Sequence, residues 1–396
     1  MAWDIHPRDA DLGRTLDPLS RWSELSLVER YGPPDTWTLT GPADELSVFT
    51  PGMGCLLERD GAQVTSGQVR TFARTAQYDD QGRPQDTITL GFIADTRELW
   101  SRLCYPDPAH SITSTPSTFG VSHDVRTASR EALILAYTSA NLGPAAPVTY
   151  RRLTSLALPA SLGRGGTATR KLRMDVLGDV VSELAEGGGL RVRIVHDEST
   201  GTPRLLMVID DVQDVSADVI FGSPDTARAS GFVTSWGYSM EDPQTTDAIA
   251  FSAGELTSRE ATRLNDTSAI ALWSRRYEVL IDQRQTDDVD EITDALTDRL
   301  TEGATPTSVE FTVAPGSGIE YRTDYDVGSA VGVELPGLPA AVSDNTIREA
   351  TTTVTRDAPE ALALVVGTPG AQSASTKTAA RLNKALRRIA LIERSR

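Results

Sequence analysis

The stretch from Trp273 to Gly303 constrains the fold more than any other part of the chain, because its pattern predicts a strand, a turn and a helix. Apolar and polar residues alternate from Trp273 to Asp282, as in a strand that buries one face. Asp287 and Asp288 can then cap a helix by accepting the unpaired N–H groups of its first turn. The apolar residues of this helix recur at steps of three and four, at Val289, Ile292, Leu296 and Leu300. Gly303 predicts a left-handed residue at the helix end, and a second β run at 308–313 follows. We therefore expect a sheet packed against one helix, without an evident catalytic group.

The length and the charge of the chain limit its organisation and its partners. A chain of 396 residues is too long for one hydrophobic core, so we expect roughly two to four domains. Hydrophobic residues make up 39% of it and charged residues 23%, which indicates a globular protein. The formal net charge is −17, and an acidic surface repels phosphates. This argues against a protein that packages DNA or regulates transcription, and is compatible with one that DNA passes without binding.

The cysteines and the N-terminal sequence predict a soluble protein made in a cytoplasm. Cys55 and Cys104 form no CxxC pair, so we expect two small buried side chains rather than a disulfide or a zinc site. The first residues contain no apolar run typical of a secretory signal. The longest uncharged run, 132–150, contains Asn141 and Pro144 and predicts no membrane span.

The local patterns predict a β-rich α+β fold. Short strands alternate within 21–103, and the Asp60-Gly61 pair suits the positive φ angles of a tight hairpin turn. Two helices, Thr127–Ala140 and Thr169–Ala185, precede two strands, and Gly328–Leu335 predicts a later strand. A β-rich block with one helix occurs twice, which predicts two related small barrels or sandwiches. The expected parts are an N-terminal arm (1–20), a first β domain (21–125, completed by strands within 216–265), an α+β insertion (126–215), a second β domain (266–345), and a C-terminal β pair with a basic amphipathic helix (346–396).

Two patterns could serve chemistry in loops, and each has a plainer structural interpretation. His110 and His123 lie in a polar connector, where a solvated histidine is the plainer interpretation than a general base. Asp324-x-Asp326-x-Gly328 resembles part of a calcium loop but lacks a third oxygen ligand and the closing glutamate. A turn before a strand explains the same residues.

Two further patterns are an acidic run and a glycine loop. Asp210, Asp211, Asp214 and Asp218 predict a solvated loop, with a metal cluster as the alternative. The loop Gly163–Gly166 could bind an anion through its N–H groups, or it simply connects two elements. It lacks the P-loop pattern, and the chain lacks the GxSxG and HExxH patterns of hydrolases. We assign no catalytic, cofactor-binding or metal-binding residue.

The strongly basic feature of the chain is its C-terminal segment, 376–396, which predicts an amphipathic helix. Seven basic residues minus Glu393 give it a charge of +6. We expect it to bind an acidic neighbour, such as another copy, rather than nucleic acid or a membrane, and a solvated charged face is the alternative. The expected interface residues are Lys377, Arg381, Lys384, Arg387 and Arg388. Deletion of this segment is expected to weaken self-assembly and to leave the β domains folded.

Several segments resemble the minor tail proteins of long-tailed phages of actinobacteria, which belong with the tail-tip or baseplate hub proteins. The segments are Arg130–Tyr137 with Asn141–Ala146, the helix Leu172–Leu184 followed by Gly187–Arg193, Trp273–Arg284 leading into an acidic helix, and Asp326–Val333. Ser329 stands where the family pattern has an acid. The resemblance covers 126–335 best and the N-terminal β block diffusely.

The resemblance implies a fold and a role in the virion, without a catalytic residue or a cofactor. Hub proteins of this kind carry two tail-tube-like β domains, form homotrimers with a pseudo-sixfold ring, and join the sixfold tail tube to a threefold tip. They surround the channel through which the tape-measure protein and DNA leave. The implied partners are the distal tail protein, the tape-measure protein and tip or fibre proteins. Two alternatives stay open: a tail-associated cell-wall hydrolase or endopeptidase, and a receptor- or carbohydrate-binding module, for which Trp236 is the residue to test.

Overall fold

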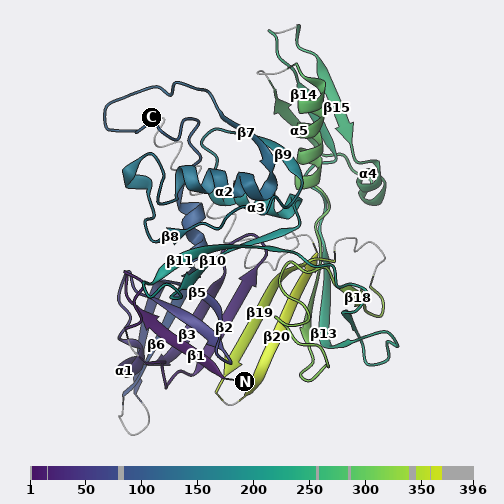
Figure 1. The fold of residues 1–396 in the computed structure, drawn as a ribbon. Helices are drawn as coiled ribbons and strands as arrows, with labels where there is room; N and C mark the ends of the chain where they lie inside the picture. Colours follow the sequence, from purple (N-terminus) through teal and green to yellow (C-terminus); the bar gives the residue numbers. More distant parts are fainter. Residues whose placement is uncertain are drawn as a thin grey trace. The chain divides into compact units, whose positions relative to one another are not determined.

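The computed structural model describes residues 2–15, 17–78, 84–255, 258–283, 287–338, 345–356 and 358–367 (Figure 1). They form a β-rich structure with few helices. The chain groups into two compact units. The first consists of 1–235, 311–336 and 345–364, and the second is built on 236–310. This grouping leaves the five-part division expected from the sequence as a prediction.

The first unit is built on a long sheet that begins with the segment expected to be an arm. Trp3–Arg8 forms strand β1, which pairs antiparallel with β4 (Gly54–Arg59). The arm prediction is wrong for these residues, because the alternating side chains of Trp3 and Ile5 are buried in the core. The strands follow in the spatial order β1, β4, β5 (Ala62–Tyr78), β6 (Pro84–Ala94), β3 (Thr36–Pro42), β2 (Glu24–Arg30), β19 (Ile347–Thr355), β20 (Ala358–Gly367), β17 (Thr307–Val313), β13 (Gly231–Met240), β12 (Ile220–Gly222) and β18 (Gly332–Glu334).

The predicted hairpin turn and strand alternation are confirmed in this sheet. Asp60 and Gly61 have φ angles of 51° and 81°, and they connect β4 to β5. The buried face of the sheet includes Trp37 and Phe92, whose rings stack with centroids 5.3 Å apart. β18 is shorter than the strand predicted over Gly328–Leu335, because Gly328 has a φ of 96° and belongs to a turn.

The insertion packs two helices and two strands around a core of its own. Strand β7 (Asp124–Ser129) pairs with β9 (Thr167–Leu172), so both predicted helices begin later than expected. Ser129 caps helix α2 by accepting a hydrogen bond from Ala132 N, and Met174, with a φ of 63°, separates β9 from helix α3. The other elements of the first unit are α1 (Ala43–Leu46), η1 (Asp95–Ser101), α2 (Arg130–Asn141), η2 (Thr149–Arg151), β8 (Leu156–Ala157), α3 (Leu177–Gly187), β10 (Leu190–Asp197) and β11 (Arg204–Asp211).

The second unit has one helix packed on a three-stranded sheet, as predicted. The sheet has the order β15 (Ala261–Asn265), β14 (Asp247–Phe251) and β16 (Glu278–Asp282). Helix α5 (Val289–Glu302) buries Ile292 and Leu296 against Ala248 and Ala250.

Two details of this unit differ from the prediction. The strand begins at Glu278 rather than Trp273, because helix α4 (Thr267–Trp273) precedes it and Ser274, with a φ of 52°, ends that helix. Gly303 has no left-handed φ, and a side chain there would clash with Thr245. The close approach of Thr245 therefore explains why position 303 is a glycine. None of the helices that the structure describes is long and apolar enough to cross a membrane.

Candidate functional site

Three of the sequence patterns described above meet in one cleft of the first unit. Arg164 comes from the glycine loop, Asp210 and Asp211 from the acidic run, and Asp324 and Asp326 from the calcium-like turn. The cleft has a volume of about 460 Å³. Its charged lining is Arg164, Arg191, Arg193, Arg322, Asp210, Asp211, Asp324 and Asp326. The fold thus gathers equal numbers of arginines and aspartates from distant parts of the sequence.

Three of the four cleft arginines pair with three of the four cleft aspartates. Arg193 binds Asp210 at 2.8 Å, and Arg164 binds Asp211 at 3.1 Å. Arg191, which is mostly buried, binds Asp326. Asp210 and Asp211 end strand β11 and face arginines, so they do not form the solvated loop expected from the sequence.

Neither the calcium-like turn nor the acidic run has the ligands that a metal site needs. Within the described ranges, the structure places no three His, Cys, Asp or Glu residues where they could hold a metal ion. Asp324 accepts a hydrogen bond from Glu320 N at 2.7 Å, and Asp214 accepts one from Ser216 N at 3.0 Å. These are turn contacts, as the plainer interpretation of the calcium-like pattern predicted.

The glycine loop does bind an anion, and that anion is the side chain of Glu131. One carboxylate oxygen accepts hydrogen bonds from Leu162 N at 2.8 Å and Arg164 N at 3.0 Å. The other accepts one from Arg164 Nη2 at 2.7 Å. Burial alone favours the protonated acid, but these hydrogen bonds outweigh it and lower the pKa of Glu131 to about 2. An internal carboxylate therefore occupies the anion site predicted at this loop.

A second buried network lies beside the cleft. Arg322 has a φ of 71°, a conformation that costs energy for a residue with a side chain. Its guanidinium binds Glu29 at 2.5 Å, and the Tyr321 hydroxyl donates to the same carboxylate at 3.0 Å. Burial, together with the charge of Glu29, raises the pKa of Tyr321 well above its usual value. Tyr321 is therefore a neutral hydrogen-bond donor that fixes the carboxylate.

A third cluster, which no sequence pattern predicted, consists of Ser66, Asp95 and His196. Ser66 Oγ donates to Asp95 at 2.6 Å, and Arg8 binds the same carboxylate at 2.5 Å. The His196 ring instead contacts Leu12 O at 2.9 Å, and its backbone N–H donates to Ser66. A nucleophilic triad needs the ring nitrogen at the serine hydroxyl. This arrangement is therefore a buried polar link that includes Asp95, the first residue of η1.

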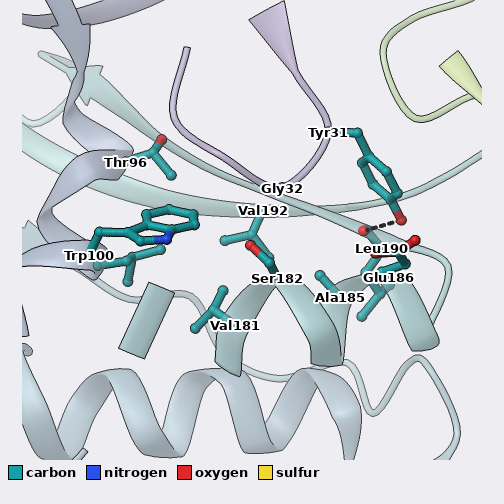
Figure 2. A pocket seen from close by; sticks show the side chains of 11 residues that line it. Tyr31, Gly32, Thr96, Trp100, Val181, Ser182, Ala185, Glu186, Leu190 and Val192 are labelled. Carbon is teal, nitrogen blue, oxygen red and sulfur yellow. Dashed lines mark hydrogen bonds between the residues drawn. The ribbon is translucent and has the colours of Figure 1, made fainter. Parts of the chain in front are cut away.

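A smaller pocket lies between the loop at Gly32 and helix α3 (Figure 2). The Tyr31 hydroxyl donates to Leu190 O at 3.0 Å at one end of it, and Trp100 closes the other. Its volume of about 10 Å³ is at the lower limit for one water molecule. It cannot hold an organic ligand.

The remaining residues singled out from the sequence do not join this cleft. His110 Nε2 lies 2.9 Å from Ser117 Oγ within the connector, which agrees with the loop interpretation. Cys55 and Cys104 are buried and free, as expected. Trp236 lies on β13 and is 39% exposed. The predicted interface residues, which are Lys377, Arg381, Lys384, Arg387 and Arg388, lie outside the described residues.

The chain is similar to known proteins over nearly its whole length. A family described as Siphovirus ReqiPepy6 Gp37-like protein matches residues 3–368. A sequence search of curated proteins found no match.

Three solved structures share the fold at low sequence identity. A tail protein from Neisseria meningitidis has a TM-score of 0.55 at 13% identity, with 94% of this chain and 98% of that chain covered. The 43 kDa tail protein of prophage MuSo2 from Shewanella oneidensis has a TM-score of 0.52 at 14% identity, covering 93% and 100%. Prophage tail protein gp18 from Listeria monocytogenes has a TM-score of 0.51 at 8% identity, covering 97% and 99%.

Proposed function

This chain belongs to the Siphovirus ReqiPepy6 Gp37-like family, and on that premise we propose that it is a structural protein of the distal end of a phage tail. The resemblance to siphophage tail proteins, first noted on short segments of the sequence, is confirmed at the level of the family. The observation that carries the proposal is the length of the match, because the family match and the fold likeness both cover nearly all of the chain. A shared accessory module would match only a part of it.

We further propose that the protein is a homotrimeric hub that joins the sixfold tail tube to a threefold tip. The long sheet of the first unit supports this, since a ring around a channel is commonly built from β domains. The net charge of −17 supports passage of DNA through the ring, because repelled phosphates do not stall on an acidic wall. The distal tail protein, the tape-measure protein and tip or fibre proteins are the neighbours we propose.

The proposed role is non-enzymatic. Its support is the candidate cleft, where the guanidinium groups of Arg164, Arg191 and Arg193 neutralise three of the four carboxylates. A zymogram on host cell wall tests the hydrolase alternative directly, and a clearing band would overturn the non-enzymatic role.

Light scattering and negative-stain imaging of the purified protein test the hub. We expect threefold rings with a central hole wide enough for duplex DNA. Antibody labelling of intact virions provides the second test, in which label should collect at the distal tail end. Monomers in solution together with label elsewhere on the particle would refute the hub.

One observation favours a second role. Trp236 exposes 39% of its surface on a strand, where most large aromatic side chains are buried. Exposed tryptophans are suited to stacking on sugar rings, so we test binding of host cell-wall glycans to the protein and to the Trp236→Ala variant. Equal binding by both proteins would remove this role from Trp236.

A further inference from the structure

Helix α5 leaves a row of carboxylates on the side opposite its buried face. Ile292 and Leu296 pack inward, whereas Asp290, Asp294 and Asp298 are exposed at every fourth position and therefore share one face. Among the residues that the structure describes, none forms a salt bridge with these three. Seven acids and one arginine between positions 287 and 302 give a net charge of −6. Like charges at this spacing destabilise a helix, so the face is suited to a cationic partner.

The chain itself contains a segment of matching charge and length. Residues 376–396 carry +6, and Lys377, Arg381, Lys384 and Arg388 recur at steps of three and four. The first and last of these cations, at 377 and 388, are 11 residues apart, and so are the first and last acids of the row that runs from Asp287, just before α5, to Asp298. The cations of the helix predicted over 376–396 would therefore lie opposite the carboxylates of α5.

The last described residue, Gly367, lies close enough to α5 for the C-terminal segment that follows it in the chain to reach this helix. Gly367 packs against Thr307, five residues after α5 ends at Glu302 and within the same unit. The eight residues 368–375 span at most about 28 Å, and a helix of 14 residues is about 21 Å long. A short tether gives its segment an effective concentration in the millimolar range, which favours the chain's own segment over that of a second copy.

We propose that residues 376–396 dock along the acidic outer face of α5 in the same chain. Lys377, Arg381, Lys384 and Arg388 supply the cations, and the row from Asp287 to Asp298 supplies the carboxylates. The sheet of this unit is a poorer site, because Arg263 and Arg276 are about half exposed there beside Asp247 and repel a basic segment. This proposal goes beyond the tail function and does not depend on it. The family match also ends at residue 368, before the segment begins.

The lysine content of the chain makes a direct test practical. Lysine occurs only at 171, 377 and 384, and Lys171 in β9 serves as the internal control. We treat the full-length protein with a carbodiimide, which joins an amine to a touching carboxylate, and map the products by mass spectrometry. The expected links run from Lys377 or Lys384 to acids of α5. Mixing unlabelled and ¹⁵N-labelled protein shows whether each link lies within one chain.

A charge-neutral variant provides the second measurement. Three exposed ion pairs of ordinary strength change the docked population by about tenfold. The triple variant Asp290→Asn, Asp294→Asn and Asp298→Asn should therefore be cut by trypsin after Lys384 about tenfold faster. The control replaces three exposed acids elsewhere, Asp11, Asp17 and Asp225, with asparagine and should leave the rate unchanged.

Three results would overturn the proposal. The first is links from Lys377 and Lys384 to acids outside α5, or no links at all. The second is links only between labelled and unlabelled chains, which would assign the segment to a second copy. The third is equal trypsin cleavage of the triple variant and the unmodified protein. A normal circular dichroism spectrum establishes that the triple variant is folded.

Discussion

Glu131 gives the sharpest test of the charge network, because its stabilisation can be calculated from one perturbed group. The carboxylate is 1% exposed, and its pKa falls from the usual 4.5 to about 2. At about 1.4 kcal/mol per pKa unit, this shift corresponds to about 3 kcal/mol of folding stability. The Glu131→Gln variant should lose about that amount at pH 7, because it leaves Arg164 without its buried counter-charge.

The pH dependence of the loss follows from the direction of the shift. The pKa of Glu131 is depressed in the folded protein, so its stabilisation is complete above pH 4.5 and disappears as the pH falls towards about 2. The difference between the variant and the unmodified protein should shrink over the same range. Urea unfolding at several pH values measures this difference through the midpoint and the slope.

The control replaces Glu24, which is exposed at the start of β2, with glutamine. It should change the free energy of unfolding by less than about 0.5 kcal/mol at every pH. A loss below about 1 kcal/mol for Glu131→Gln at pH 7 would refute the reasoning. If the loss of folding free energy in Glu131→Gln stays constant down to pH 2, the destabilisation comes from packing rather than from charge.

Three further perturbations test separate parts of the structure. Gly61→Ala should destabilise the β4–β5 hairpin by about 1 kcal/mol in thermal unfolding, because the φ of 81° is strained for alanine while the space around it is open. Leu296→Ala in α5 should lower the free energy of unfolding, measured in urea, by about 2–5 kcal/mol. Val289→Ala, at an exposed position of the same helix, should lower it by less than about 0.5 kcal/mol. Equal losses would contradict the assignment of Leu296 to the buried face. Burial raises the pKa of the Cys104 thiol to about 12, so thiol reagents should label it at pH 8 only after unfolding, and rapid labelling of the native protein would contradict the burial.

Local patterns predicted most elements of this fold, because each depends on residues that are neighbours in sequence. The alternation of Leu25, Leu27, Trp37 and Leu39 marked two strands that bury these side chains. The Asp60-Gly61 turn was predictable for the same reason, since its chemistry lies within two residues.

Elements that depend on a distant partner were predicted less well. Residues 169–172 have a helical pattern, yet they form a strand because the ladder with β7 satisfies their backbone. Trp3–Arg8 lacked a strong local signal and was expected to be an arm, but β4 supplies the pairing that makes it a strand. Tertiary contacts decided both segments.

The candidate cleft shows the same limit for a functional site. Its glycine loop, acidic run and calcium-like turn were each visible in the sequence, and each suggested an anion or a metal as a ligand. The structure instead supplies the missing partner from another of the patterns: Arg164 from the glycine loop binds Asp211 from the acidic run. Arg191 was not singled out as a candidate for binding, yet it binds Asp326. Sequence spacing carries no information on such pairs, because they form only when β10, β11 and the later turn come together.

The distribution of charge bears on the proposed passage of DNA. The cleft arginines and aspartates cancel, and so do the −6 of the α5 stretch and the +6 of residues 376–396. The remaining residues therefore carry the whole net charge of −17. A docked C-terminal segment would hold its cations against α5 and away from passing phosphates, whereas an undocked one would present them to DNA. If the segment docks as proposed, its deletion should leave DNA retention by the protein unchanged at physiological salt, because the cations it removes were already neutralised.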